Sequence, residues 1–195
     1  MSKRGPSWQN EALEVVRALR AGGVVLTSTD TVWGLACDAT QPEAVERMAA
    51  LKGRPAEKSF IALVADDGLF ERLLSDLPES GWELMEASDR PVTVVGQAGP
   101  RHGLAAGMVR ADGSLGVRRV NDPYLEFILR GVNRPLASTS ANFSGEASDG
   151  TFRSVPAAIV EAVDAVGTFR RDGVGGAPSW VVQFDADGRF KVLRS

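Results

Sequence analysis

The sequence has very few of the side chains that most often bind metals or act as nucleophiles. Cys37 is the only cysteine and His102 the only histidine among 195 residues. One cysteine excludes an intramolecular disulfide, and one cysteine with one histidine is too few for the usual zinc site. Cys37 is expected to be a small buried residue, and His102, in a Pro-Arg-His-Gly-Leu setting, a solvated loop residue.

Long hydrophobic runs and clusters of positive charge are also missing. No apolar stretch approaches the roughly 18 residues that span a bilayer, and the start MSKRGPSWQN has no hydrophobic segment after its charges. We therefore expect a cytoplasmic protein with no membrane partner. Lys and Arg number 22 against 25 Asp and Glu, without any basic run, so a broad nucleic-acid surface is not expected.

The common nucleotide-binding and hydrolase signatures are absent as well. The chain has no Gly-x-x-x-x-Gly-Lys-Ser/Thr phosphate loop, no Gly-x-Gly-x-x-Gly after a strand and no Gly-x-Ser-x-Gly elbow. Any nucleotide site in this chain must therefore be built from other residues.

What the chain does contain is an alternation of helical and strand patterns, which predicts one α/β domain over residues 1–195 with a mixed sheet. The polar stretch after the first strand is predicted as a loop. Strands are predicted at 24–27, 59–64, 91–95, 115–120 and 135–138, and a terminal hairpin at 180–184 and 189–193. Helices are predicted around 12–19, 41–51, 67–75 and 79–87, and after the starts at 122–123 and 154–156.

Two predicted helices begin with capping signals. Thr40-Gln41-Pro42-Glu43 fits a capping box, in which the Thr40 hydroxyl would bind a free backbone amide and Glu43 would reach back. This helix would end near Lys52. Asp122 followed by Pro123 is the second signal, because an acidic cap often precedes proline at the first helical position.

Three polar segments rich in small residues lie at the ends of predicted elements, where open α/β sheets bind ligands. They are STDTVWGLACDAT (28–40), KGRP (52–55) and STSANFSG (138–145). Lys52 and Arg54 form either a solvated helix end or a clamp for polyphosphate. The hydroxyls and amide of 138–145 form either a plain turn or an array of neutral donors for phosphate oxygens.

The first of these segments also suggests a pocket wall. In an extended chain, Thr29, Thr31 and Trp33 would lie on one side, because side chains alternate along a strand. This arrangement predicts a hydroxyl-lined pocket with an aromatic wall, and the alternative places Trp33 in the core.

The motifs together resemble the YrdC/TsaC family of threonylcarbamoyl-AMP synthases over nearly the whole chain. The resemblance rests on GGVVLTSTDTVWGLACDAT, LKGRPAEKSF, SLGVRRV and RPLASTSANFSG, in this order and at the family's spacing. It implies a YrdC-like fold, a twisted open mixed sheet with flanking helices. The sequence departs from the family pattern at Ser28, where proline is usual, at Trp33, where tyrosine is commoner, and at PSWVVQ (178–183).

The resemblance also implies the substrates and the site. ATP phosphates would be bound by a catalytic set, with two further residues flanking the nucleotide, and L-threonine would contact three others. The catalytic set is Lys52, Arg54, Ser140 and Asn142; the nucleotide-flanking residues are Ser148 and Arg194; the threonine residues are Thr29, Arg118 and Ser138.

The implied reaction joins L-threonine, bicarbonate and ATP for the threonylcarbamoyladenosine modification of tRNA, next to the anticodon. Mg²⁺ is expected to be carried by ATP, without a protein-bound cofactor or metal site. Threonylcarbamoyl-transferase proteins and tRNA are further possible partners. Two alternatives stay open, namely an RNA-binding module and a paralogue that makes a different carbamoyl-adenylate.

Overall fold

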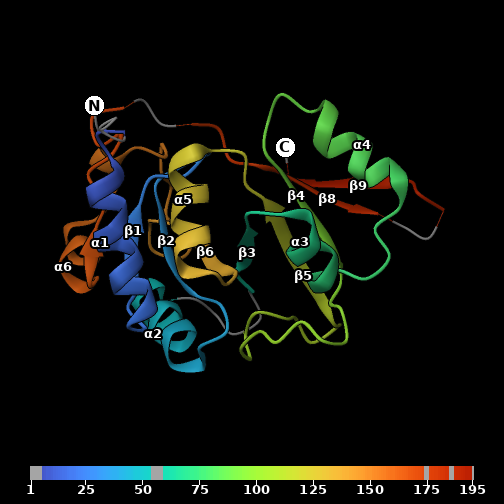
Figure 1. Cartoon of the computed structure of the whole chain (residues 1–195), viewed down its shortest axis with the longest axis horizontal. Helices are drawn as coiled ribbons and strands as arrows, with labels where there is room; N and C mark the ends of the chain where they lie inside the picture. Colours follow the sequence, from blue (N-terminus) through green and yellow to red (C-terminus); the bar gives the residue numbers. More distant parts are fainter. Residues whose placement is uncertain (1–5, 54–58, 174–175, 185–186, 195) are drawn as a thin grey trace, which may run out of the picture.

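The described residues of the computed structural model, 6–53, 59–173, 176–184 and 187–194, form a nine-stranded sheet flanked by helices (Figure 1). The strand order is β7-β1-β2-β6-β3-β5-β4-β8-β9. The strands are β1 (Val25–Thr27), β2 (Gly34–Asp38), β3 (Ile61–Val64), β4 (Val92–Gln97), β5 (Ser114–Arg119), β6 (Leu136–Ser140), β7 (Ala165–Val166), β8 (Trp180–Phe184) and β9 (Phe190–Arg194). The helices are α1 (Gln9–Arg20), α2 (Pro42–Lys52), α3 (Asp67–Leu73), α4 (Glu79–Ala87), α5 (Pro123–Val132) and α6 (Ala157–Ala162), with a 3₁₀ turn at Phe152–Ser154.

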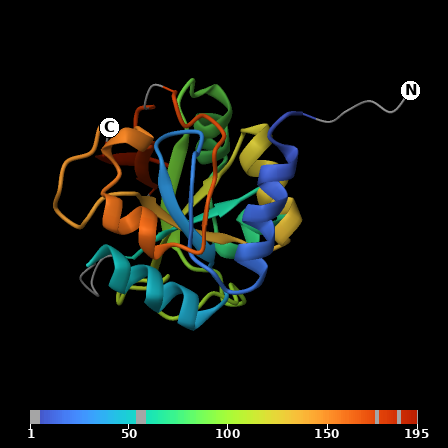
Figure 2. The ribbon, with the colours of Figure 1, turned by 90° about the vertical axis from the view of Figure 1, so that its left-hand side faces the viewer.

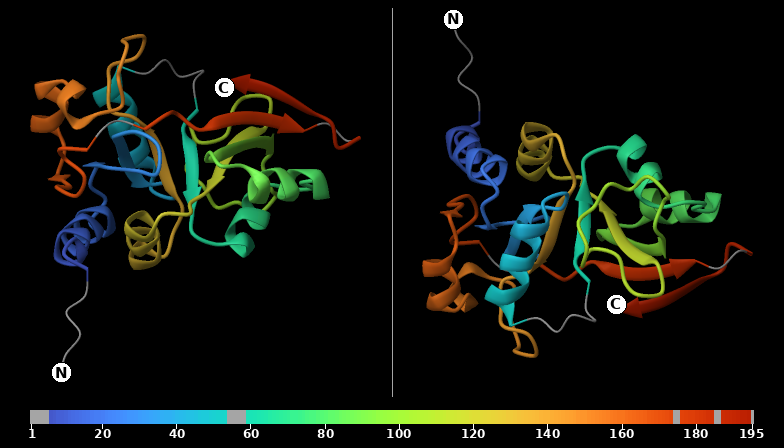
Figure 3. Two further views of the ribbon diagram at one scale, coloured as in Figure 1. Left: turned by 90° about the horizontal axis from the view of Figure 1, so that it is seen from above. Right: turned by 90° about the horizontal axis from the view of Figure 1, so that it is seen from below.

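Both kinds of strand pairing occur in this sheet. The pairs β1–β7, β3–β5 and β4–β8 are parallel, and the other five pairs are antiparallel. The predicted mixed sheet is therefore confirmed, and so is the pairing of the terminal hairpin β8–β9. Residues 185–186 of its connection lie outside the described residues. Figure 3 shows this hairpin at the opposite end of the molecule from α1 and α6.

Helices α1 and α5 cover part of one face of the sheet. Val25 pairs with Ala36 and Leu63 pairs with Leu136, and all four pack against apolar residues of these two helices. Residues that alternate with them, such as Leu35, Ala62 and Ala137, join a second buried cluster with residues of α2, α3 and α6. Figure 2 shows β1 and β2 between α1 on one side and α2 and α6 on the other.

The ends of α2 and α5 show which capping predictions hold. α2 ends at Lys52, as predicted, and Gly53 follows in the left-handed conformation with φ of 59°. The capping box at Thr40 is wrong, because the Thr40 hydroxyl donates to Asp38 Oδ1 at 2.7 Å and the helix starts without a side-chain cap. At α5, the Asp122 carboxylate accepts from the Leu125 amide at 3.0 Å, which confirms the predicted cap.

Strand β2 lies inside the segment that was predicted as a loop. Its five residues are all buried, and it pairs with β1 on one side and β6 on the other. The sequence Gly-Leu-Ala-Cys-Asp lacks the β-branched residues that mark a strand. Its position between two neighbours supplies the stability that local propensity does not.

Candidate active site

A cavity of about 300 Å³ opens on the face of the sheet that carries α1 and α5. The Ser138 side chain lies on this face because Ser138 pairs with Ala36 and with Ile61. Arg118 shares the face through its pairing with Leu63. This volume is at the lower end of the range for small-molecule sites. The described residues that line the cavity are Thr29, Thr31, Val32, Gly34, Ile61, Leu63, Arg118, Ser138, Thr139, Ser140, Asn142, Ser148, Gly150, Pro178, Ser179 and Arg194.

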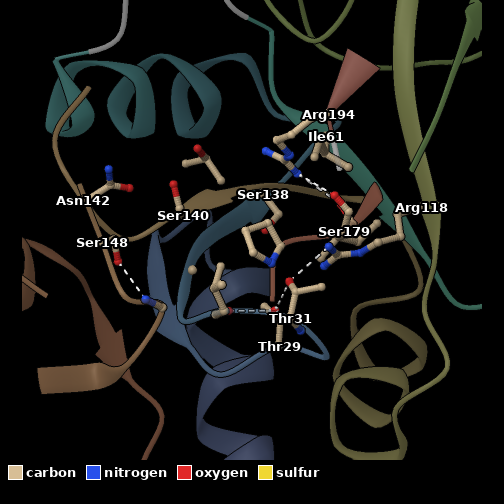
Figure 4. Close-up of a pocket in the computed structure, with 16 residues that line it drawn as sticks. Thr29, Thr31, Ile61, Arg118, Ser138, Ser140, Asn142, Ser148, Ser179 and Arg194 are labelled. Atoms are coloured by element: carbon tan, nitrogen blue, oxygen red, sulfur yellow. Dashed lines mark hydrogen bonds between the residues drawn. The ribbon is translucent and has the colours of Figure 1, made fainter. Parts of the chain in front are cut away.

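Arg118 is a buried charge at one side of this cavity (Figure 4). Only 5% of its side chain is exposed; Nη2 lies 2.9 Å from Asp30 Oδ1, and Nη1 donates to Thr31 Oγ1 at 3.2 Å. The contact with Asp30 is an ion pair without hydrogen-bond alignment. Within the described part of the chain, Arg118 Nε has no hydrogen-bond partner. Arg118 itself lines the cavity, so its guanidinium presents a positive charge to a planar anion such as a carboxylate.

Burial shifts both members of this ion pair toward their neutral forms. It raises the pKa of the Asp30 carboxyl, and the positive charge of Arg118 opposes that rise. It lowers the pKa of the Arg118 guanidinium, and the negative charge of Asp30 opposes that fall. Each charge therefore depends on the other for its stability in the folded protein.

Residues 29–32 form a turn closed by side-chain hydroxyls. Thr29 Oγ1 donates to the Val32 carbonyl at 2.7 Å, accepts the Thr31 amide at 3.1 Å and lies 2.9 Å from Thr31 Oγ1. Both threonines line the cavity, as predicted. The only proton of the Thr29 hydroxyl goes to Val32, so Thr31 Oγ1 is the donor in the 2.9 Å contact and both lone pairs of Thr29 Oγ1 are engaged within the turn.

Because these residues form a turn, the predicted alternation through Trp33 fails. Trp33 is 5% exposed, belongs to the buried cluster with Leu35, and packs edge-on against Phe152 with ring centroids 4.9 Å apart. It is not among the residues that line the cavity. Its assignment to a pocket wall is wrong, and the alternative in the core is correct.

Lys52 lies next to the cavity without lining it. Its side chain reaches from the end of α2 to the chain after β6, and the whole residue is 4% exposed. Lys52 Nζ donates to the carbonyl oxygens of Ser140 and Asn142 at 2.7 and 2.8 Å, and to Asn142 Oδ1 at 3.2 Å. A longer contact of 3.4 Å reaches Ser140 Oγ. Lys52 therefore fixes the segment that carries Ser140 and Asn142.

The same segment is held by further local bonds. Asn142 Nδ2 donates to the Glu146 carbonyl at 2.6 Å, and Ser148 Oγ accepts the Gly150 amide at 3.1 Å. Figure 4 shows Asn142, Ser140 and Ser148 at the side of the cavity away from Arg118. This side therefore presents hydroxyl and amide groups, with the Lys52 ammonium beside them.

Arg194 belongs to strand β9, paired with Val181, although it is the penultimate residue of the chain. Its Nη2 donates to the carbonyl and the hydroxyl of Ser179, each at 3.2 Å. Burial lowers the pKa of Arg194. Strand pairing and Ser179 therefore bring a second guanidinium into the cavity, on the side of Arg118 (Figure 4).

The cavity collects most of the residues that the sequence singled out. Lys52 contacts two of them from outside the lining, and Arg54 lies outside the described residues. Those that line the cavity are Thr29, Arg118, Ser138, Ser140, Asn142, Ser148 and Arg194.

Sequence reasoning missed Asp30 and Ser179, the partners of the two arginines. Asp30 lies within the polar segment 28–40, but no pattern in the sequence distinguishes it from the other polar residues of that segment. Ser179 lies in PSWVVQ (178–183), a segment that the sequence marks only as a departure from the family pattern. Ser179 carries no local signal, because it precedes the amino end of strand β8, whereas ligands gather at the carboxyl ends of strands.

The described residues contain no group of three or more His, Cys, Asp or Glu side chains that could hold a metal ion. Among the same residues, no helix is long and apolar enough to cross a membrane. Cys37 is fully buried, and burial raises its pKa to about 12, which confirms it as a core residue. His102 Nδ1 accepts the Leu104 amide at 2.9 Å within a loop, as expected.

Comparison with known proteins gives one family. The sequence profile of the Sua5/YciO/YrdC family, described as "Telomere recombination", matches residues 17–195. A protein of Stutzerimonas stutzeri named threonylcarbamoyl-AMP synthase is 34% identical over 154 residues, covering 78% of this chain and 82% of its own. A protein of the same name from Stenotrophomonas maltophilia is 38% identical over 135 residues, with 67% and 71% covered.

Solved structures share the fold. E. coli YciO superimposes with a TM-score of 0.78 at 20% identity, covering all of this chain and 96% of its own. P. abyssi Sua5 complexed with L-threonine gives a TM-score of 0.77 at 23% identity, covering 98% of this chain and 55% of its own. The fold expected from the resemblance is confirmed.

Proposed function

This chain belongs to the Sua5/YciO/YrdC family, and we propose that it forms threonylcarbamoyl-AMP and pyrophosphate from ATP, L-threonine and bicarbonate. It is then a nucleotidyltransferase that supplies a tRNA modification, and its place is the cytoplasm. The observation that carries the proposal is that one cavity is lined both by residues assigned to the threonine substrate and by residues assigned to ATP. Relatives named threonylcarbamoyl-AMP synthase support the same activity.

The reaction has two steps. The threonine amine forms a bond to the carbon of bicarbonate, and water leaves, which gives a carbamate. An oxygen of this carbamate then attacks the α-phosphate of ATP, and the bond to pyrophosphate breaks. Neither step needs a covalent bond to the protein, which suits a chain with one histidine and one buried cysteine. The protein contributes orientation and charge.

In this proposal, the two sides of the cavity divide the substrates. Arg118 binds the threonine carboxylate, Ser138 pairs with the threonine hydroxyl, and Thr29 contacts the amino acid from the turn 29–32. Ser140 and Asn142 orient the phosphates beside the positive charge of Lys52. Arg54 is assigned to the phosphates by family resemblance. Ser148 flanks the nucleotide on the side of Ser140 and Asn142, and Arg194 reaches the nucleotide from the side of Arg118.

We expect Mg²⁺ to enter with ATP, held by the phosphates and water. Two carboxylates of the segment 28–40 already have partners, because Asp30 pairs with Arg118 and Asp38 accepts from Thr40. The bound ion would neutralise part of the triphosphate charge. The transferase that accepts the product, and tRNA, are the expected partners downstream.

The test is to incubate purified protein with ATP, L-threonine and ¹³C-labelled bicarbonate, and to analyse the products by mass spectrometry. The proposal predicts pyrophosphate release that depends on threonine, and an adenylate that carries the label. An RNA-binding module would release no pyrophosphate. A paralogue would release pyrophosphate without threonine, from a different carbamoyl donor.

A further inference from the structure

We call the side of the active site that carries Arg118 and Thr29 the amino-acid side, and the side that carries Ser140 and Asn142 the phosphate side. A second cavity, of about 480 Å³, lies behind the amino-acid side. Thr29 and Thr31 line both cavities, so the turn 29–32 separates them. Arg118 lines the first cavity only, and Asp30 lines the second only. The buried ion pair between Arg118 and Asp30 therefore crosses the partition, with the carboxylate on the far side from the substrates.

The charges that line the first cavity show why the position of Asp30 matters. Arg118 and Arg194 are the only charged side chains among the described residues that line the first cavity. They are close enough that the positive charge of Arg194 lowers the pKa of Arg118. Two guanidinium groups facing one space are suited to phosphate or pyrophosphate, which they bind through paired hydrogen bonds.

The ligands of this cavity differ in charge. The threonine carboxylate has a single negative charge, whereas ATP and pyrophosphate carry several. An uncompensated pair of arginines would favour the polyanion over the amino acid, because the attraction grows with the charge of the ligand. The side of the cavity that receives threonine therefore needs a negative charge that does not occupy the space.

We propose that Asp30 is a positioning and specificity-determining residue, which balances Arg118 from behind so that this side accepts a monoanionic carboxylate and rejects polyphosphate. The assignment rests on the proposed function. Asp30 meets the requirement because its side chain is 9% exposed and lies 2.9 Å from Arg118 without lining the substrate cavity. Thr31 holds the other amino group of the same guanidinium, which fixes its plane.

The experiment measures L-threonine binding by calorimetry at increasing pyrophosphate concentration in wild type, Asp30→Asn, Asp30→Glu and Asp89→Asn. Asp89→Asn is the control, because Asp89 also lines the second cavity. In wild type and the control, pyrophosphate should leave the apparent Kd for threonine within about twofold. In Asp30→Asn, the ratio of the threonine Kd to the pyrophosphate Kd should rise roughly tenfold, with pyrophosphate competing directly against threonine. Asp30→Glu should restore most of the wild-type preference.

Thermal unfolding of each variant shows whether it is folded at the temperature of the titration. An Asp30→Asn protein that is folded and binds threonine without pyrophosphate competition overturns the assignment. If Asp30→Asn unfolds, Asp30→Ser in the presence of stabilising glycerol provides the same comparison, and equal competition in that variant and wild type also overturns it. A wild type that binds no threonine contradicts it too. A wild type that binds threonine but makes no adenylate contradicts the proposed activity alone.

Discussion

The two sides of the cavity are held in place by different parts of the protein. On the amino-acid side, Arg118 is positioned by two side chains, the Asp30 carboxylate and the Thr31 hydroxyl. On the phosphate side, Lys52 binds two backbone carbonyls, and through them fixes the course of the chain after β6. A substitution on the first side therefore alters charge and orientation locally, whereas loss of Lys52 also releases the backbone that carries Ser140 and Asn142.

The largest effect is expected at Lys52. Lys52→Ala removes a positive charge beside the phosphates and leaves the carbonyls of Ser140 and Asn142 without this donor. Each bond to a charged group contributes about 1.5 to 3 kcal/mol, so kcat/KM for ATP should fall by roughly a hundredfold or more. Pyrophosphate release measures the effect, with Lys191→Ala on the exposed strand β9 as the control. A kcat/KM for ATP within twofold of wild type would show that Lys52 does not contribute to the use of ATP.

A similarly large effect is expected on stability at Arg118, and it should depend on pH. Arg118→Ala leaves Asp30 as a buried carboxylate without its cation, which costs about 3 to 5 kcal/mol at neutral pH. The folded-state pKa of Asp30 is already raised, and loss of Arg118 raises it further. Protonation then favours the folded state, so the deficit should shrink as the pH falls from 7 toward 5 and grow as it rises.

Urea unfolding at both pH values measures this change. Arg119→Ala is the matched control, because Arg119 pairs with the exposed Asp67 instead. The double variant Arg118→Ala/Asp30→Asn should recover stability at pH 7. A deficit that is the same at pH 5 and pH 7 would show that Asp30 does not carry a buried charge.

A moderate effect is expected at Ser138 and Thr29, which the proposed function places at the threonine substrate. Thr29 already donates to Val32, so Ser138 is the residue with the greater role in selection. Wild type should reject valine by a factor of roughly 10⁴ and accept serine poorly, because an unpaired hydroxyl site costs more than a lost methyl. Ser138→Ala should lower the ratio of kcat/KM for threonine to kcat/KM for valine, measured by pyrophosphate release. An equal fall of this ratio in Thr29→Val would contradict the greater role of Ser138.

The smallest effect on activity is expected at Trp33, which lies in the core. Trp33→Phe should lower the free energy of unfolding by roughly 1 to 3 kcal/mol and leave both KM values unchanged. In a protein that keeps Trp33 as its only tryptophan, fluorescence should not respond to threonine with ATP. A clear response would move Trp33 to the pocket wall, against its contact with Phe152.

Sequence patterns predicted the elements that carry their own local signals. The pattern over 79–87 gave helix α4 at its observed bounds, and Asp122 with Pro123 gave the start of α5. Most of the site residues that the family resemblance indicated line the cavity. The predictions failed for two reasons. β2 is stabilised by its neighbours in the sheet, which is tertiary context. Thr40 binds Asp38 instead of its own helix, and the turn at Thr29 redirects Trp33, through local side-chain bonds that hydrophobic patterns do not encode.

The partners of the two arginines could not be predicted, because their contacts depend on tertiary context. Asp30 and Arg118 are distant in sequence, and only the crossing of the turn 29–32 over the end of β5 brings them together. The pairing of β8 with β4 and β9 likewise brings Arg194 to the cavity.

The most direct test of a divided cavity is a crystal structure of the wild-type protein with L-threonine and a non-hydrolysable ATP analogue. The account predicts the threonine carboxylate on Arg118, the threonine hydroxyl within hydrogen-bond distance of Ser138, and the triphosphate along Ser140 and Asn142. A carboxylate bound elsewhere, or phosphates in contact with Arg118 and remote from Ser140 and Asn142, would contradict it.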